Sequence, residues 1–261
     1  MPLRGQDLFD LENSWKFADY LFTAHEYDLA ANELERIVFL DSTNIEAKLL
    51  LIRTYRLSGK IKTGLQKTES FFHSDSDIPD RFSMEYGKML ISDKQFKQVE
   101  QFITLNNSLN PDEKLFLNLS GQMMSEKYKS ARNLIVQNQN VDYYYIKPYS
   151  NLLSQEEKFN YKKPGWSSLM SAIVPGTGKI YSGYWKDGLM SLLFVGVFSF
   201  QSYRGFSKNG IESAYGWIFG GLAFGFYIGN IYGSAKAANQ HNVVFKHKLH
   251  HQVEEVFNSF E

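Results

Sequence analysis

The sequence predicts an all-α protein with two parts: a tetratricopeptide-like helical repeat array and, after it, a two-helix transmembrane hairpin. Two observations lead to this fold class. Residues 11–141 hold few glycines and prolines and many apolar residues at helical spacing, in units that recur along the chain. Residues 213–235 contain no charged residue at all. We therefore expect two regions that are built for different surroundings.

The composition excludes several classes of function before any motif is considered. The chain has 261 residues and a formal net charge of +0, so no basic excess points to nucleic acid as a partner. It has no cysteine, which excludes disulfides, zinc–thiolate sites and a cysteine nucleophile. Of its 19 glycines, 14 lie between residues 165 and 233, so the average composition hides two unlike regions.

A repeated pattern organises residues 11–141, which we expect to form the repeat domain. Large apolar side chains recur just after four short turns, at spacings of 34, 35 and 32 residues: Tyr27, Ile61, Phe96 and Tyr128. Three residues further along each unit stand residues suited to close helix packing: Ala30, Gly64, Val99 and Ala131. We expect these two sets of side chains, above all in the first, third and fourth units, to pack the repeats together.

This region resembles the tetratricopeptide repeat, a unit of about 34 residues with two antiparallel helices. The matching stretches are "FADYLFTAHEYDLAANELERIVFLDSTN" and, more loosely, "EYGKMLISDKQFKQVEQFITLNNSLNP". The second and fourth units depart from the pattern, and Ile52 stands where a small residue is expected, so the repeat count stays open. The resemblance implies an array whose concave face binds a protein or peptide. The alternative is a plain helical bundle with an accidental period.

The stretch "PGTGK", residues 175–179, has the last letters of a nucleotide-binding phosphate loop but not the rest of that motif. A phosphate loop requires a glycine at position 173 and a hydroxyl residue at position 180, and both positions hold isoleucine. The same stretch begins a P-G-x-G-x-x-Y-x-G motif, formed by Pro175, Gly176, Gly178, Tyr181 and Gly183. This motif resembles the start of small bacterial two-transmembrane-helix domains. The resemblance implies a membrane location and a helix hairpin, and it implies no reaction.

We expect the membrane domain over residues 166–242, with spans near residues 184–204 and 213–235. Each span contains an uncharged run that approaches or reaches the length of a bilayer core, and a short polar turn joins the two. Glycines recur every four residues in the second span, and such small residues let helices approach closely. The expected helix-packing residues are Gly216, Gly220, Gly221, Gly225, Gly229 and Gly233.

Two segments flank this domain. Residues 142–165 are rich in tyrosine and lysine, and they predict either a juxtamembrane collar at the lipid headgroups or a last helix that caps the repeats. Residues 243–261 predict an amphipathic helix that lies on the membrane or docks on the repeats. Its histidines have a spacing that could hold a metal, but no further ligand lies on that face, so we expect no metal site at His247, His250 and His251.

These features predict an integral membrane protein of a bacterial inner membrane, with the lipid bilayer and a protein or peptide as partners. Lysines outside the two spans favour cytoplasmic termini, although a signal peptide lost before "PLRGQ" would place the repeats in the periplasm. The expected function is a non-enzymatic, membrane-anchored scaffold. The alternative is a glycine-striped hairpin that joins copies of the chain into a small channel or a membrane-remodelling complex. No acid pair, triad or metal set occurs at useful spacing, so we expect no catalytic residue and no cofactor.

Overall fold

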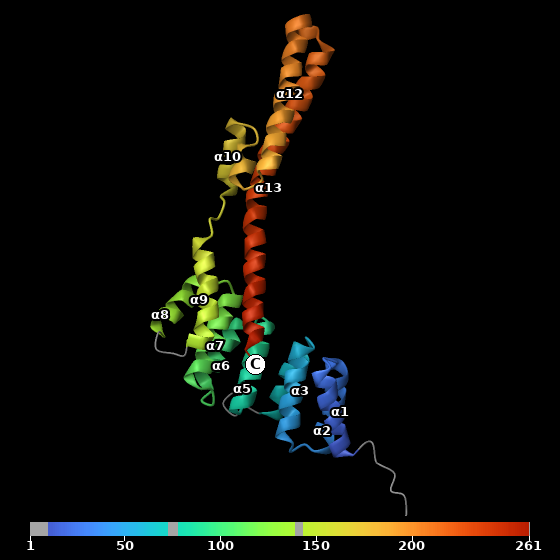
Figure 1. Ribbon diagram of the computed structural model, residues 1–261, viewed down its shortest axis with the longest axis vertical. Coiled ribbons are helices and arrows are strands. Elements are labelled where there is room, and N and C mark those ends of the chain that lie inside the picture. Colours follow the sequence, from blue (N-terminus) through green and yellow to red (C-terminus); the bar gives the residue numbers. More distant parts are fainter. Residues whose placement is uncertain (1–9, 73–77, 139–142, 261) are drawn as a thin grey trace, which may run out of the picture. The chain divides into compact units, whose positions relative to one another are not determined.

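The computed structural model describes residues 10–72, 78–138 and 143–260. Within these ranges every regular element is a helix, so the predicted all-α class is confirmed. The chain divides into two units, the first of residues 1–153 and 253–261 and the second of residues 154–252. Figure 1 shows the order of the helices within each unit.

The first unit is a series of helix pairs followed by one further helix. The pairs are α1 (Leu11–Thr23) with α2 (Tyr27–Leu40), α3 (Ile45–Leu57) with α4 (Ile61–Phe71), α5 (Asp80–Ser92) with α6 (Phe96–Leu105), and α7 (Pro111–Met124) with α8 (Tyr128–Gln137). Each helix packs against the next as far as α8, and α5 also packs against α3 and α7. The odd-numbered helices α3, α5 and α7 therefore form one layer. The chain then enters α9 (Tyr143–Lys158), which begins in this unit.

The four pairs share one turn geometry. Each turn contains one residue with a positive φ: His25 (65°), Gly59 (75°), Lys94 (60°) and Glu126 (58°). In three of the turns, the next residue donates its backbone N–H to the carbonyl group five residues earlier, as in a Schellman motif. The second helix of each pair begins at Tyr27, Ile61, Phe96 or Tyr128, the residues that the sequence places just after the turns. The period in the sequence is thus also a period in the backbone.

Side-chain caps fix the starts of three odd-numbered helices. The side chains of Asp10, Asn44 and Asn110 each accept a hydrogen bond from the backbone N–H three residues later. At α7 the Glu113 side chain also accepts from the backbone N–H of Asn110, which completes a capping box, and Pro111 is the first helical residue. Caps of this kind typically contribute about 1 kcal/mol each to stability.

The core of the first unit lies between its helices. One buried cluster in the first two pairs consists of Ala18, Ala31, Leu34, Ile37, Val38, Ala47, Leu51 and Tyr55. Ile52, which departs from the small residue expected at its place in the repeat, is fully buried. The core therefore accommodates the larger side chain, and the helix pair continues through this departure from the pattern.

The second unit contains two short helices and a long helix hairpin. Helices α10 (Pro164–Ile173) and α11 (Thr177–Tyr181) lead into α12 (Trp185–Asn209), and a 3₁₀ turn at Gly210–Glu212 joins α12 to α13 (Ala214–Ser259). Phe226 of α13 stacks against both Phe194 and Phe198 of α12, with ring centroids 5.3 and 5.1 Å away. Helix α13 is continuous where the sequence separates a second span, a polar segment and a C-terminal helix, and its last residues, from Val253 on, belong to the first unit.

The predicted transmembrane hairpin and the predicted integral-membrane localisation are wrong. Among the described residues, no helix combines the length and the apolar character that a membrane span requires. Both α12 and α13 are long, so the shortfall lies in their apolar character. They contain many glycine, serine, tyrosine and tryptophan residues, which carry no charge but are only weakly apolar. The spans expected near residues 184–204 and 213–235, in a bacterial inner membrane, therefore do not hold.

Candidate functional site

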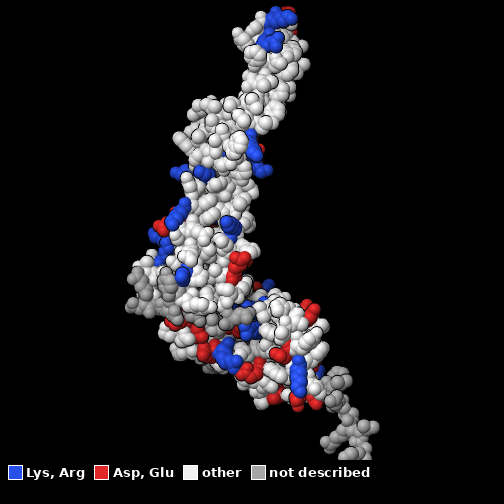
Figure 2. All heavy atoms as spheres, viewed as in Figure 1, with Lys and Arg blue, Asp and Glu red and all other residues white. Residues whose placement is uncertain are grey.

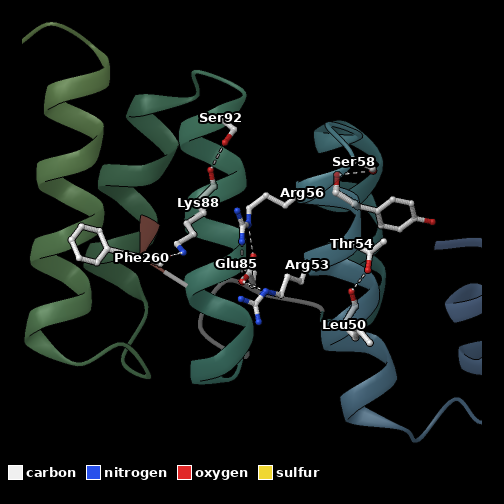
Figure 3. Close-up of polar contacts among 10 residues, drawn as sticks. Leu50, Arg53, Thr54, Arg56, Ser58, Glu85, Lys88, Ser92 and Phe260 are labelled. Carbon is white, nitrogen blue, oxygen red and sulfur yellow. Dashed lines mark hydrogen bonds and ion pairs between the residues drawn. The ribbon is translucent and has the colours of Figure 1, made fainter. Parts of the chain in front are cut away.

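A cluster of charged side chains joins α3 to α5. Arg56 Nε donates a hydrogen bond to Glu85 Oε2 at 2.5 Å, and Arg53 Nε lies 3.8 Å from Glu85 Oε1. Figure 3 shows both arginine side chains reaching from α3 toward Glu85 on α5. The Arg56 and Glu85 side chains are largely buried. Burying charges is costly even when they are paired, so this cluster adds little net stability. Its main effect is to favour one alignment of α3 and α5.

Lys88 lies one turn beyond Glu85 on α5, and its side chain extends toward Phe260 and away from the arginines of α3 (Figure 3). Only 2% of the residue is exposed, and its ammonium group donates a hydrogen bond to the backbone carbonyl oxygen of Phe260 (Figure 3). The same nitrogen lies 5.9 Å from the ring centroid of Phe116 on α7. A buried ammonium group needs such partners, since an unsatisfied charge in the interior is strongly unfavourable.

The end of α13, residues 253–260, lies against this part of the first unit. Phe257 stacks on Phe116 with ring centroids 6.2 Å apart and planes 6° apart, and Phe260 meets the same ring edge-on at 5.1 Å. Phe260 also contacts Tyr144 of α9 at 5.3 Å. Val253, Phe257 and Phe260 are 0%, 3% and 8% exposed. A segment of the chain's own C-terminal helix is thus held by aromatic contacts and a main-chain hydrogen bond.

Helix α9 packs against α7, next to Phe116. Tyr149 is fully buried, and its hydroxyl lies 2.8 Å from Ser120 Oγ on α7. Burial raises the pKa of Tyr149 above its ordinary value, and the hydrogen bond with Ser120 opposes this shift only in part. The phenol therefore stays protonated and uncharged under all ordinary conditions, so Tyr149 serves as a packing and hydrogen-bonding residue.

An open pocket of about 240 Å³ lies between α1, α3 and α5. Its lining consists of Trp15, Glu46, Leu49, Leu50, Arg53 and Arg81. Arg81 and Glu46 form an ion pair at the exposed rim. The pocket therefore has an indole and two leucine side chains as apolar walls, with two guanidinium groups beside them. Such a lining suits an apolar side chain that is followed by an acidic group.

These residues belong to two sites on the odd-numbered helices: the open pocket between α1, α3 and α5, and the site around Lys88 and Phe116 that holds residues 253–260. We define the odd-helix face as Trp15 of α1, Leu49 and Arg53 of α3, Arg81 and Lys88 of α5, and Phe116 of α7. Within the described ranges, no group of three or more histidine, cysteine, aspartate and glutamate side chains is placed to hold a metal ion.

The residues expected to pack the repeats lie behind this face. Ala30, Val99 and Ala131 are almost completely buried. Tyr128 is also buried, whereas Tyr27 and Phe96 are half-buried at the starts of their helices. These side chains position the helix pairs, and none of them belongs to the odd-helix face.

The P-G-x-G-x-x-Y-x-G motif forms a compact junction in the second unit. Pro175 and Gly176 make the turn between α10 and α11, and the Gly176 N–H donates to Asn230 Oδ1 at 3.1 Å. A Cβ atom on Gly178 would overlap the Ser167 carbonyl oxygen, so the close approach of α10 and α11 requires glycine there. Gly183 lies in the next turn with a φ of 90°.

The lysine of "PGTGK" makes a contact within the protein, because Lys179 Nζ donates a hydrogen bond to Ser191 Oγ at 2.8 Å. Tyr181 lies beside Lys162, whose ammonium group is 4.8 Å from the ring centroid.

The glycines of α13 fall into two groups. A Cβ atom at Gly216 or Gly220 would meet side chains of α12, and one at Gly233 would meet the stem of Lys179. By contrast, Gly221, Gly225 and Gly229 have no such neighbour within 4 Å, and they line an open groove of about 510 Å³. The structure therefore brings only part of the glycine stripe against another helix.

Several residues of the odd-helix face have no signal in the sequence. Arg53, Arg81 and Lys88 are charged residues on amphipathic helices, where a solvated position is the usual expectation. Phe116 belongs to the fourth unit, whose pattern is degenerate. The clearest available signal is the apolar face of the C-terminal helix, because such a face indicates that this helix packs against something.

Comparison with known proteins provides no relative from which a function could be transferred. No family model, no curated protein and no solved structure matches this chain. The resemblances to tetratricopeptide repeats and to two-helix membrane domains therefore rest on the residues alone.

Proposed function

We propose that the protein is a non-enzymatic scaffold whose helix pairs form a tetratricopeptide-like array that binds a peptide segment on the odd-helix face. The observation that carries this proposal is the position of residues 253–260. Their aromatic side chains pack on Phe116 and their main chain meets Lys88. The face therefore already binds one helical segment, which belongs to the same chain.

The recurring backbone supports the array as a binding framework. Four pairs with the same turn place α3, α5 and α7 side by side, so the open pocket and the site of residues 253–260 lie along one layer of helices. Repeat arrays commonly bind extended or helical segments along such a surface. The even-numbered helices pack against their odd-numbered neighbours and keep them in place.

The open pocket indicates the chemistry of an external partner. Its apolar walls and the guanidinium groups of Arg53 and Arg81 suit an amphipathic helix that carries an apolar anchor and a nearby carboxylate. Such a carboxylate would compete with Glu46 for Arg81, because these two side chains already form an ion pair. The partner is therefore expected to be an acidic amphipathic peptide.

Site-specific crosslinking in cells tests this function. A photoreactive phenylalanine derivative replaces Leu49 in the pocket, and in a matched control it replaces Phe39, which is 86% exposed on α2. The proposal expects discrete adducts from position 49 alone, and it expects their loss when Arg81→Glu is added. Equal adducts from both positions, or none from position 49, would contradict it. Mass spectrometry of the adducts identifies the partner peptide.

A second candidate function is self-association through the hairpin. Large apolar side chains of α12 and α13 are mostly exposed, among them Phe200 (60%), Trp217 (62%) and Phe224 (67%). Figure 2 shows few charged atoms over the surface of this hairpin in the view drawn, apart from those around the turn between the two helices. Exposed apolar patches of this kind mark contact surfaces. A second copy of the chain presents a matching patch, and this favours an assembly of copies.

Sedimentation of the purified protein tests this second candidate. Wild type is expected to sediment as an oligomer, and the double variant Phe200→Ser and Phe224→Ser as a smaller species, whereas Phe39→Ser on α2 leaves the oligomer unchanged. A wild-type protein that is monomeric at every concentration and sediments only with phospholipid vesicles rules out self-association. That outcome would identify lipid as the partner of the hairpin.

A further inference from the structure

The segment formed by residues 253–260 contacts the first unit in the manner of a bound ligand helix. Its buried side chains, Val253, Phe257 and Phe260, recur at i, i+4 and i+7, which is one face of a helix. Glu255, Asn258 and Ser259 between them are exposed. Burial is therefore concentrated on one side of the segment, as it is for a helix that lies in a groove.

The contacts are concentrated on one anchor, as they are in peptide interfaces. The Phe116 ring meets both Phe257 and Phe260, and Phe116 itself is fully buried. Interfaces commonly place most of their binding energy in such central aromatic contacts. The two phenylalanines three residues apart thus define the recognition pattern of this segment.

The polar contact adds a second requirement. Lys88 is almost fully buried and donates to the carbonyl oxygen of Phe260, at the C-terminal side of the aromatic pair. If the segment leaves, this ammonium group loses that acceptor. A replacement ligand therefore needs an oxygen acceptor, either a main-chain carbonyl or a carboxylate, directly after its aromatic pair.

We infer that residues 253–260 are a ligand bound in cis, and that the partner of the array is a peptide of the same pattern, Phe-x-x-Phe followed by an oxygen acceptor, which displaces them. This inference rests on the proposed function and names the partner class. Binding in trans then requires release of the C-terminal segment. In the closed state described here, the segment covers Phe116 and competes with the partner for Lys88.

Peptide binding to the full-length chain tests the inference. The probe is a fluorescent peptide with the sequence of residues 249–261, and its binding is followed by anisotropy. We expect weak binding to wild type and at least about tenfold tighter binding to the double variant Phe257→Ala and Phe260→Ala, whose own segment is released. The matched control variant, Asn258→Ala and Ser259→Ala, changes exposed residues of the same segment and is expected to behave as wild type. A peptide in which both phenylalanines are alanine is expected not to bind.

The single variant Phe260→Ala guards against misfolding, because it removes one ring and leaves the buried Val253 and Phe257 in place. Its circular dichroism spectrum is expected to match wild type, and its peptide affinity to lie between those of wild type and the double variant. Equal peptide affinity for all proteins, or no binding to a folded Phe260→Ala variant, overturns the inference. The proposed function is judged separately, by the crosslinks from position 49, which lies in the open pocket and not under the C-terminal segment.

Discussion

At the residue scale, three of the four turns of the first unit carry a conformational cost that the fourth avoids. His25, Lys94 and Glu126 adopt positive φ values, which are unfavourable for residues with a Cβ atom, whereas Gly59 adopts the same geometry freely. The shared turn therefore persists in spite of three unfavourable residues, because the helices on either side determine it.

The turns give a paired prediction with opposite signs. Lys94→Gly is expected to raise the free energy of unfolding by about 1 kcal/mol, because it removes the strain of a side chain at positive φ. Gly59→Ala is expected to lower it by about 1 kcal/mol, and a Cβ atom there would meet no other group within 4 Å, so the backbone alone is responsible. Urea unfolding of both variants measures the two changes, and a shift of the same sign in both would contradict this explanation.

Asn106 stabilises the connection between α6 and α7 from a fully buried position. Its side-chain nitrogen donates to Ser83 Oγ at 2.9 Å, and its side-chain oxygen accepts from the backbone N–H groups of Ser108 and Leu109 at 3.0 Å each. Asn106→Ala leaves these groups without that partner, so we expect a loss of about 2–4 kcal/mol in the free energy of unfolding. Chemical denaturation measures this loss, and a change below about 1 kcal/mol would show that water replaces the amide.

The residues of the repeat framework could be read from the sequence, but those of the binding face could not. Tyr27, Ile61, Phe96 and Tyr128 are recognisable because they follow turns at a regular interval, and helices begin at each of them. The pairing of Arg56 with Glu85 depends on the distance between α3 and α5, which a linear pattern does not contain. Charged residues on a helix are usually solvated, so the sequence gives no reason to bury them.

At the element scale, helix packing in the first unit depends on small residues at particular contacts. A Cβ atom on Gly64 of α4 would lie 2.5 Å from Met89 Sδ and 3.1 Å from Tyr55 Cβ. On Gly121 of α7, the nearest such atom is Val99 Cγ1 at 4.0 Å. The two glycines are therefore alike in sequence but differ in the space around them.

This difference predicts opposite effects for the same substitution. Gly121→Ala is expected to raise the midpoint of thermal unfolding, because alanine is the better helix former by about 1 kcal/mol and fits the available space. Gly64→Ala is expected to lower the midpoint, because the cost of overpacking, about 1–3 kcal/mol, exceeds that gain. Thermal unfolding followed by circular dichroism compares them, and the packing argument fails if Gly64→Ala is as stable as Gly121→Ala.

For the long helices α12 and α13, the sequence does not specify which surface covers their apolar faces. An amphipathic pattern identifies the buried face of the C-terminal helix, but it does not distinguish a membrane from the repeats as the surface that covers this face. The uncharged runs of α12 and α13 also suggested lipid, yet neither helix is both long and apolar enough to span it. Both cases depend on the surroundings of an element, and the sequence of the element does not specify these.

His241 in α13 gives a pH-dependent prediction for the second unit. Its ring stacks with Phe159, which in turn stacks with Phe245. Burial, with a smaller effect from the charge of Lys162, lowers the pKa of His241 below the ordinary value of 6.5. Because the folded state binds the proton less readily than the unfolded state, the stability contribution is complete above pH 6.5 and is lost as the pH falls through the lowered pKa.

Denaturation between about pH 8 and about pH 5 tests this prediction. Wild type is expected to lose stability on acidification, and His241→Gln to lose less. His247→Gln, which changes an exposed histidine of the same helix, is the matched control and is expected to keep the wild-type slope. If His241→Gln has the same slope as wild type, the stacked histidine has no part in the pH dependence.

At the scale of the whole molecule, the limits of the repeat unit differ from those that the repeat pattern suggests. The pattern ends near residue 141, but the compact first unit includes residues to 153 and the end of α13. Ile146, Tyr149, Leu152 and Leu153 of α9 are all buried. Since Tyr149 covers Phe116 and bonds to Ser120, α9 completes the last helix pair.

This boundary predicts how fragments of the chain behave. A fragment of residues 1–153 is expected to fold as a helical unit, whereas one of residues 1–141 leaves the α7 surface uncovered. Burial of each large apolar side chain of α9 contributes about 1.5–3 kcal/mol to the free energy of unfolding, before the loss of conformational entropy is subtracted. We therefore expect the midpoint of thermal unfolding of the shorter fragment to be about 10 °C lower. It should also bind more of a hydrophobic dye. Circular dichroism and dye fluorescence of the two fragments, at equal concentration, measure both effects. If the fragments unfold together, α9 lies outside the cooperative unit.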